Sequence, residues 1–192
     1  MAAPLHSLDE SVANQSIKIL RELLVSSEHL GVTDIIIPCV DQSSLSSSEA
    51  VGRLVNKVRP MLDIAGKAGI NLSLETDLGP HDFFKLLEKF DSKHVTVNYD
   101  IGNSAALGFD SIEELDAYGD RITDIHIKDR TLNGSSVILG QGNANFDRFF
   151  KKLKEFNYKG PFIMQAYRDD EGVEVFNRQL KWIRPYLDQF SS

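Results

Sequence analysis

Four polar side chains stand near the C-terminal ends of four segments with strand-like sequences. The segments are INLSLE, HVTVNYD, ITDIHIKD and PFIMQAY, and the side chains are Glu75, Asp100, His126 and Gln165. In a sheet of parallel βα units, the C-terminal strand ends gather on one face, where binding and catalysis are built. Two carboxylates, an imidazole and an amide oxygen in that position suit a divalent metal with mixed oxygen and nitrogen ligands. This arrangement predicts a metal-dependent enzyme domain.

The chain alternates between helical and strand periodicity. Strands are predicted over 33–40, 70–75, 94–100, 122–129 and 161–167, and helices over 9–30, 46–69, 81–90, 111–118, 145–157 and 173–189. We expect Ser7 to cap the first helix and Gly31 to end it. Strands separated by helices of this length indicate right-handed βαβ units and a parallel sheet.

Alternation of side chains divides the strands into two faces. In 122–129, Ile125 and Ile127 share one face, and Asp124, His126 and Lys128 share the other; 70–75 and 94–100 divide in the same way. We expect the apolar faces to lie against helices and the polar faces to form a solvated, concave side. The pattern favours all or part of a TIM-type barrel over a flat doubly wound sheet, whose strands are apolar on both faces.

Composition narrows the class of protein. The 192 residues suffice for one domain, and a hydrophobic fraction of 42% with 26% charged residues is ordinary for a globular chain. With 28 acidic and 21 basic residues the net charge is −7, and no long Lys/Arg run is present, so we expect neither nucleic acid nor a membrane surface as partner. No apolar run approaches membrane-spanning length and the start does not resemble a signal peptide, which predicts a cytoplasmic protein. The single cysteine, Cys39, lies in an apolar run and is expected to be a buried hydrophobe.

Five sequence blocks resemble the sugar phosphate isomerase/epimerase family of xylose isomerase-like TIM barrels. They are ETDLGP, NYDIGNSAALGFD, IHIKDR, LGQGNANF and YKGPFIMQAYR, and the resemblance runs from about residue 4 to 183. It implies a divalent metal (Mn²⁺, Zn²⁺, Co²⁺ or Mg²⁺) held by a glutamate, an aspartate, a histidine and a second glutamate. The first three positions fall on Glu75, Asp100 and His126. The fourth falls on Gln165, a departure from the commonest pattern.

The resemblance implies a reaction on a sugar or sugar phosphate. In it a ketose passes through an enediolate, while one glutamate removes a proton beside the carbonyl and the other returns a proton on the opposite face. Of these catalytic positions, Glu75 keeps the carboxylate, but Gln165 cannot carry a proton. A one-base 1,2-isomerisation, or a second acid/base supplied by Asp129, Lys128 or another segment, therefore stays open.

Further residues are expected to contact the substrate. They are Asn103 of the D-x-G-N block, the strand-end Lys128 and Asp129, and the loop glycines Gly140 and Gly142. The glycine loop resembles a phosphate-binding loop with a helix start beyond it, although a simple tight turn explains it equally well.

The resemblance also concerns the extent of the barrel. The family has eight strands, whereas five principal strands are counted here, so 1–192 is interpreted as one partial-barrel domain, the C-terminal portion of a longer barrel that lacks the first three strands. Its first strand is expected to be an uncovered edge that favours homo-oligomers. Two alternatives remain: a non-catalytic sugar-binding remnant, indicated by Gln165, and an apurinic endonuclease-like enzyme, which needs more histidine ligands and a basic surface.

Overall fold

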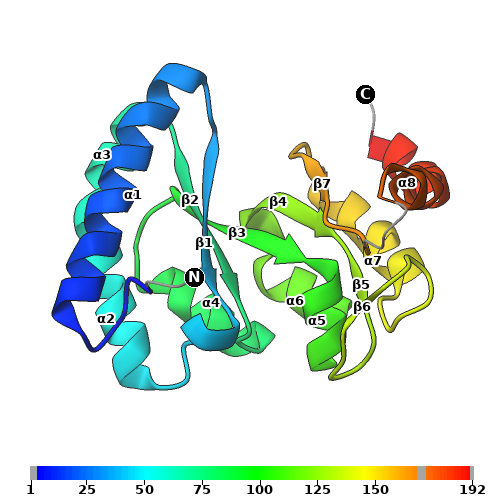
Figure 1. Cartoon of the computed structure of the whole chain (residues 1–192), viewed down its shortest axis with the longest axis horizontal. Helices are drawn as coiled ribbons and strands as arrows, with labels where there is room; N and C mark the ends of the chain where they lie inside the picture. The colour runs from blue at the N-terminus through cyan, green and yellow to red at the C-terminus, as the bar shows by residue number, and fades with distance from the viewer. Residues whose placement is uncertain (1–3, 168–171, 191–192) are drawn as a thin grey trace. The chain divides into compact units, whose positions relative to one another are not determined.

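The computed structural model describes residues 4–167 and 172–190 and contains a five-stranded sheet of order β1-β2-β3-β4-β7 (Figure 1). Its strands are β1 (Asp34–Cys39), β2 (Asn71–Thr76), β3 (Val95–Asp100), β4 (Ile122–Ile127) and β7 (Phe162–Met164). The pairs β1/β2, β2/β3 and β4/β7 are parallel. The helices are α1 (Glu10–Leu30), α2 (Ser48–Val58), α3 (Leu62–Ala68), α4 (Pro80–Glu88), α5 (Ile101–Leu107), α6 (Ser111–Tyr118), α7 (Phe146–Leu153) and α8 (Val173–Leu187). The predicted alternation of parallel strands and helices is confirmed.

The chain divides into two compact units, Met1–Val97 and Asn98–Ser192, whose boundary falls inside strand β3. In the first unit, Asp9 caps α1 by accepting hydrogen bonds from the N–H groups of Ser11 and Val12. The prediction of Ser7 as the cap is wrong, because its hydroxyl accepts from the N–H of Asp9, two residues before the cap position. Gly31 ends the helix at a φ of 68°, a left-handed conformation that glycine adopts without strain.

The predicted helix over 46–69 is interrupted at a proline. Ser47 caps α2 as expected of the serine run, but α2 ends at Val58 and a 3₁₀ turn over Arg59–Met61 leads into α3. Pro60 has no N–H to donate to the preceding turn, so the α-helical ladder cannot run through it. Gly69 then ends α3 in the left-handed conformation.

The second unit differs from prediction at three places. Helix α5 follows β3 without a loop, the predicted strand 122–129 ends at Ile127, and the predicted strand 161–167 is limited to Phe162–Met164. A short antiparallel hairpin of β5 (Asp129–Arg130) and β6 (Ser136–Val137) follows β4. Aromatic packing supports the unit: Phe149 stacks on Tyr99 with ring centroids 5.0 Å apart, and Trp182 of α8 meets Phe146 edge-on at 5.2 Å.

The polar face of the strands is buried, which corrects the expectation of a solvated surface. Ser73 and Thr96 share a hydrogen bond of 2.7 Å, and the amide of Asn98 lies 3.3 Å from Nδ1 of His126. These side chains are tolerated inside the protein because they hydrogen-bond to one another. Among the described residues, no helix is both long and apolar enough to cross a membrane.

Candidate metal and substrate site

Asp100 is the last residue of β3 and the N-cap of α5. Its Oδ1 accepts a hydrogen bond of 2.8 Å from the N–H of Asn103. Its Oδ2 lies 3.4 Å from Nζ of Lys128 and 3.9 Å from Nδ1 of His126, and 1% of the side chain is exposed. One oxygen therefore starts a helix, while the other faces a cation and an imidazole.

His126 lies next to the last residue of β4, and it is buried. Burial lowers the pKa of His126, the positive charge of Lys128 adds to this lowering, and the carboxylate of Asp100 opposes it. The imidazole is therefore neutral at pH 7 and keeps a nitrogen lone pair, which is the form that binds metals.

Glu75 lies half-buried near the end of β2. The register of β2 and β3 pairs Leu74 with Val97, so Glu75 comes next along a ladder whose other strand continues to Asp100. Within the second unit, Oδ2 of Asp100 and Nδ1 of His126 lie 3.9 Å apart, and Glu75 belongs to the first unit, where it lies near the end of the strand that pairs with β3. Two carboxylates and an imidazole fit a divalent metal with mixed oxygen and nitrogen ligands.

Gln165 immediately follows β7, and its side chain is exposed. Its N–H donates to the carbonyl of Ile127 at 3.0 Å, which continues the parallel ladder between β4 and β7. Because His126 pairs with Ile163, Gln165 continues the face that carries His126, two residues closer to the C-terminal strand ends.

A pocket of about 910 Å³ in the second unit contains two residues predicted from the sequence, Lys128 and Gln165. It is lined by Lys128, Ser135, Ser136, Met164, Gln165, Ala166, Tyr167, Gly172, Val173 and Phe176. Lysine, serine and amide groups supply hydrogen bonds, while Tyr167 and Phe176 supply apolar area. Sequence analysis did not identify the serines or the aromatic residues, because they belong to a hairpin and a helix start with no distinctive spacing.

The structure gives Asp129 and the glycine loop a different role from the expected substrate contact. Oδ2 of Asp129 accepts hydrogen bonds from the N–H groups of Gly140 (2.9 Å) and Gly142 (2.8 Å), and Oδ1 accepts from Ala144 at 3.1 Å. The residue is fully buried, at 0% exposure. The loop N–H groups that were expected to bind a phosphate thus donate to this carboxylate, while the substrate contacts expected of Asp129, Gly140 and Gly142 stay predictions.

Asn103 accepts hydrogen bonds from two positively charged side chains. Its Oδ1 accepts from Nζ of Lys128 at 3.3 Å and from Nη1 of Arg130 at 2.9 Å. Arg130 was missed by sequence analysis, although it continues the alternation of His126 and Lys128. Its Nε and Nη2 both donate to the carbonyl of Gly134, which fixes the guanidinium beside Asn103.

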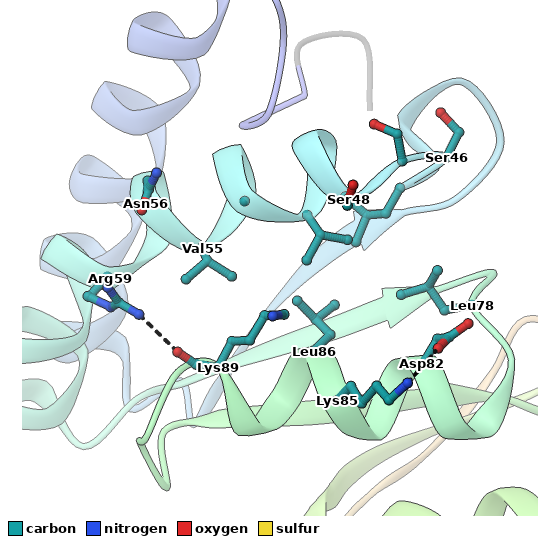
Figure 2. A pocket seen from close by; sticks show the side chains of 14 residues that line it. Ser46, Ser48, Val55, Asn56, Arg59, Leu78, Asp82, Lys85, Leu86 and Lys89 are labelled. Atoms are coloured by element: carbon teal, nitrogen blue, oxygen red, sulfur yellow. Dashed lines mark hydrogen bonds and ion pairs between the residues drawn. The ribbon is translucent and has the colours of Figure 1, made fainter.

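A second pocket, of about 690 Å³, lies between α2 and α4 in the first unit (Figure 2). Figure 2 shows Arg59 donating to the carbonyl of Lys89, at 3.0 Å, and Lys85 turned toward Asp82. None of the residues predicted to bind metal or substrate lines this pocket.

The family described as xylose isomerase-like TIM barrel matches residues 1–186. The chain belongs to this family. Membership confirms the family expected from the sequence blocks, and solved xylose isomerase-like structures confirm the partial-barrel fold. A xylose isomerase domain protein from Planctomyces limnophilus superposes with a TM-score of 0.83 at 20% identity, covering 98% of this chain and 71% of that one. The IolI protein with a bound zinc atom gives 0.82 at 19% identity, covering 98% and 75%.

Curated relatives of this xylose isomerase-like chain carry epimerase names. The putative L-ribulose-5-phosphate 3-epimerase SgbU of Haemophilus influenzae is 28% identical over 201 residues, which cover 97% of this chain and 70% of the relative. The L-ribulose-5-phosphate 3-epimerase UlaE of Escherichia coli O1:K1 / APEC is 27% identical over 192 residues, covering 94% and 67%. The chain therefore spans about seven tenths of the length of these relatives.

Proposed function

We propose that this chain is a divalent-metal-dependent isomerase or epimerase of a sugar or sugar phosphate, which moves a proton beside the carbonyl of a ketose. The observation that carries the proposal is the buried pair of Asp100 and His126 in the second unit, 3.9 Å apart and beside the ammonium of Lys128. The names of the relatives support the substrate class, as does the similar fold of a D-allulose 3-epimerase in complex with D-allulose.

The metal would be held by Glu75, Asp100 and His126, with the amide oxygen of Gln165 as a further ligand. Asp100 and His126 are both buried, so each is held in one orientation by its surroundings. When bound, the metal supplies Lewis acidity that polarises the carbonyl and hydroxyl oxygens of the sugar.

Glu75 is the proton carrier in this proposal. Its carboxylate takes the proton from the carbon beside the carbonyl, and the electrons of the broken C–H bond form the enediolate of the sugar. Return of the proton to the neighbouring carbon gives an isomer. Delivery to the opposite face gives an epimer and needs a second donor, a task that the amide of Gln165 cannot perform.

Lys128 connects Asp100 with the pocket of the second unit. Its ammonium lies 3.4 Å from Oδ2 of Asp100, and the residue is one of those that line the pocket of about 910 Å³. A positive charge there attracts the anionic oxygens of an enediolate or a phosphate. Tyr167 and Phe176 offer apolar surface to the carbon skeleton of the sugar.

The test is exchange of substrate protons with D₂O, followed by NMR with Mn²⁺ and a panel of ketoses and ketose phosphates. Glu75→Gln should remove the exchange while leaving sugar binding, measured by calorimetry, largely intact. Glu22→Gln, which changes a carboxylate on the exposed surface of α1, should exchange at the wild-type rate. Wild-type exchange in Glu75→Gln would rule out Glu75 as the base.

The replacement of a family glutamate by Gln165 favours a second candidate, a sugar-binding protein without catalysis. Stoichiometric sugar binding with no proton exchange for any ketose in the panel, at saturating Mn²⁺, would support this candidate and reject the enzyme.

A further inference from the structure

Helix α8 carries a polar side chain within its buried stripe. Val175, Gln179 and Ile183 are spaced four residues apart, lie on one side of the helix and are almost fully buried. Burial of an amide is unfavourable unless its hydrogen bonds are made inside the protein. A leucine has similar volume and carries no such requirement, so apolar packing does not explain a glutamine at this position.

The amide of Gln179 binds two segments that are far apart in the sequence. Its Oε1 accepts from the N–H of Leu139 at 3.1 Å. Its Nε2 donates to the carbonyl of Tyr167 at 2.8 Å and reaches the carbonyl of Val175 at 3.4 Å. A single rigid amide group therefore sets the positions of two backbone segments relative to α8.

One of the two segments lines the pocket of the second unit, and the other holds Asp129, the residue that follows the pocket residue Lys128. Leu139 leads into Gly140 and Gly142, whose N–H groups hold Asp129 at the start of β5. Tyr167 lines the pocket of about 910 Å³ together with Gln165, two residues earlier. Helix α8 makes a further contact with the first segment, because a Cβ at Gly140 would lie 2.6 Å from the ring of Trp182.

We propose that Gln179 is a positioning residue, which ties the loop 139–143 and the segment 165–167 to α8 and thereby fixes Gln165 and the pocket wall for substrate. The catalytic consequence rests on the proposed function. The positional effect on the two segments does not, since it follows from the hydrogen bonds of Gln179 alone.

The experiment measures amide hydrogen exchange and turnover in the same variants of the full 192-residue chain. Gln179→Leu should speed exchange at the Leu139 amide and in the peptide covering 163–167 by at least tenfold, because the bonds to both segments are lost. The value of kcat/KM for a responsive ketose should fall, with the loss mainly in KM. The control Val175→Ala removes buried area from the same stripe and should loosen α8 without singling out those two segments.

Gln179→Glu tests the contacts with Leu139 and Tyr167 separately. It also replaces the leucine variant if that variant does not fold. A carboxylate still accepts from Leu139 but has no hydrogen to donate to Tyr167, so exchange should increase over 163–167 and stay slow at Leu139. Unchanged exchange in both segments, or the same local pattern in Val175→Ala, would overturn the proposal. Loosened segments with unchanged kcat/KM would reject the positioning role. Amide exchange could become faster in both segments of the variants while the wild-type protein exchanges no substrate proton for any ketose. That result would reject the proposed function and leave the positional effect standing.

Discussion

One carboxylate oxygen of Asp100 caps helix α5, and the other faces Lys128 and His126. The residue thus belongs both to the backbone framework and to the candidate metal site. A substitution that preserves the cap and removes the charge separates the two roles, because asparagine caps helices about as well as aspartate does.

Asp100→Asn should lose most of its Mn²⁺ affinity, measured by calorimetry, while the free energy of unfolding stays within about 1 kcal/mol of wild type. Asp100→Ala should lose the same affinity and about 1 kcal/mol more stability, measured by urea unfolding, because the N–H of Asn103 loses its acceptor. Undiminished Mn²⁺ binding in the asparagine variant would remove Asp100 from the site.

Strand periodicity predicts residues of the site only as far as the strands extend. Alternation in 122–129 correctly put His126 and Lys128 on one face, and both approach Asp100. Beyond Ile127 the chain enters a hairpin, and strand periodicity did not predict that three loop N–H groups donate hydrogen bonds to Asp129. Those bonds join residues 11 to 15 positions apart, which no local pattern reveals.

At the scale of elements, helix α5 shows how tertiary packing overrides propensity. The segment IGNSAAL contains Gly102, Asn103 and Ser104, which are poor helix formers, and no helix was predicted there. The cap at Asp100 starts the helix. Gly102 then permits its close approach to the backbone of Lys128, because a Cβ would lie 3.0 Å from the carbonyl carbon of that residue.

A buried carboxylate joins β3, α5 and α6. Glu114 accepts hydrogen bonds from the hydroxyls of Tyr99 (2.7 Å), Tyr118 (2.9 Å) and Ser104. Burial raises the pKa of Glu114 above its usual 4.5, although the three hydroxyl donors work in the opposite direction. The folded protein therefore binds the Glu114 proton more tightly than the unfolded chain does.

This difference predicts a specific dependence of stability on pH. The stabilising contribution of protonated Glu114 is fully present below about pH 4.5, the unfolded value, and is lost as the pH rises through the higher folded pKa. Relative to Glu114→Gln, wild type should lose free energy of unfolding across that window and then reach a plateau. Urea unfolding of both proteins from pH 4 to 8 gives the free energy of wild type minus that of the variant, and a value that increases with pH would contradict the assignment.

At the scale of the whole chain, exposed apolar side chains lie beside β1, the first strand of the sheet. An apolar hollow of about 140 Å³ is lined by Leu5, Ser16, Ile19, Leu20, Leu23 and Ile35–Ile37, from the N-terminal segment, α1 and β1. Ile19 and Leu23 are 45% and 46% exposed, and β1 stands at the end of the strand order. Edge strands beside exposed apolar side chains favour association between chains.

We therefore expect the 192-residue chain to self-associate, with a mass by light scattering that rises with concentration to at least twice 21.5 kDa. Ile19→Glu combined with Leu23→Glu should shift the mass toward the monomer. Lys18→Glu, which adds negative charge to the same helix without removing apolar surface, should have a smaller effect. A wild-type chain that stays monomeric at every concentration would show that this surface does not drive association.

Because Cys39 is buried, the rate at which a thiol reagent labels it measures how often the edge strand β1 opens. Burial raises the pKa of the thiol to about 12, and the negative charge of Asp77 adds to the effect, so the closed protein holds almost no reactive thiolate at pH 8. A thiol reagent then modifies Cys39 only after β1 has parted from its neighbours. With reagent in excess, the labelling rate reports how often that parting occurs. If labelling is faster than global unfolding, β1 opens on its own; if the two rates agree, β1 is released only when the protein unfolds.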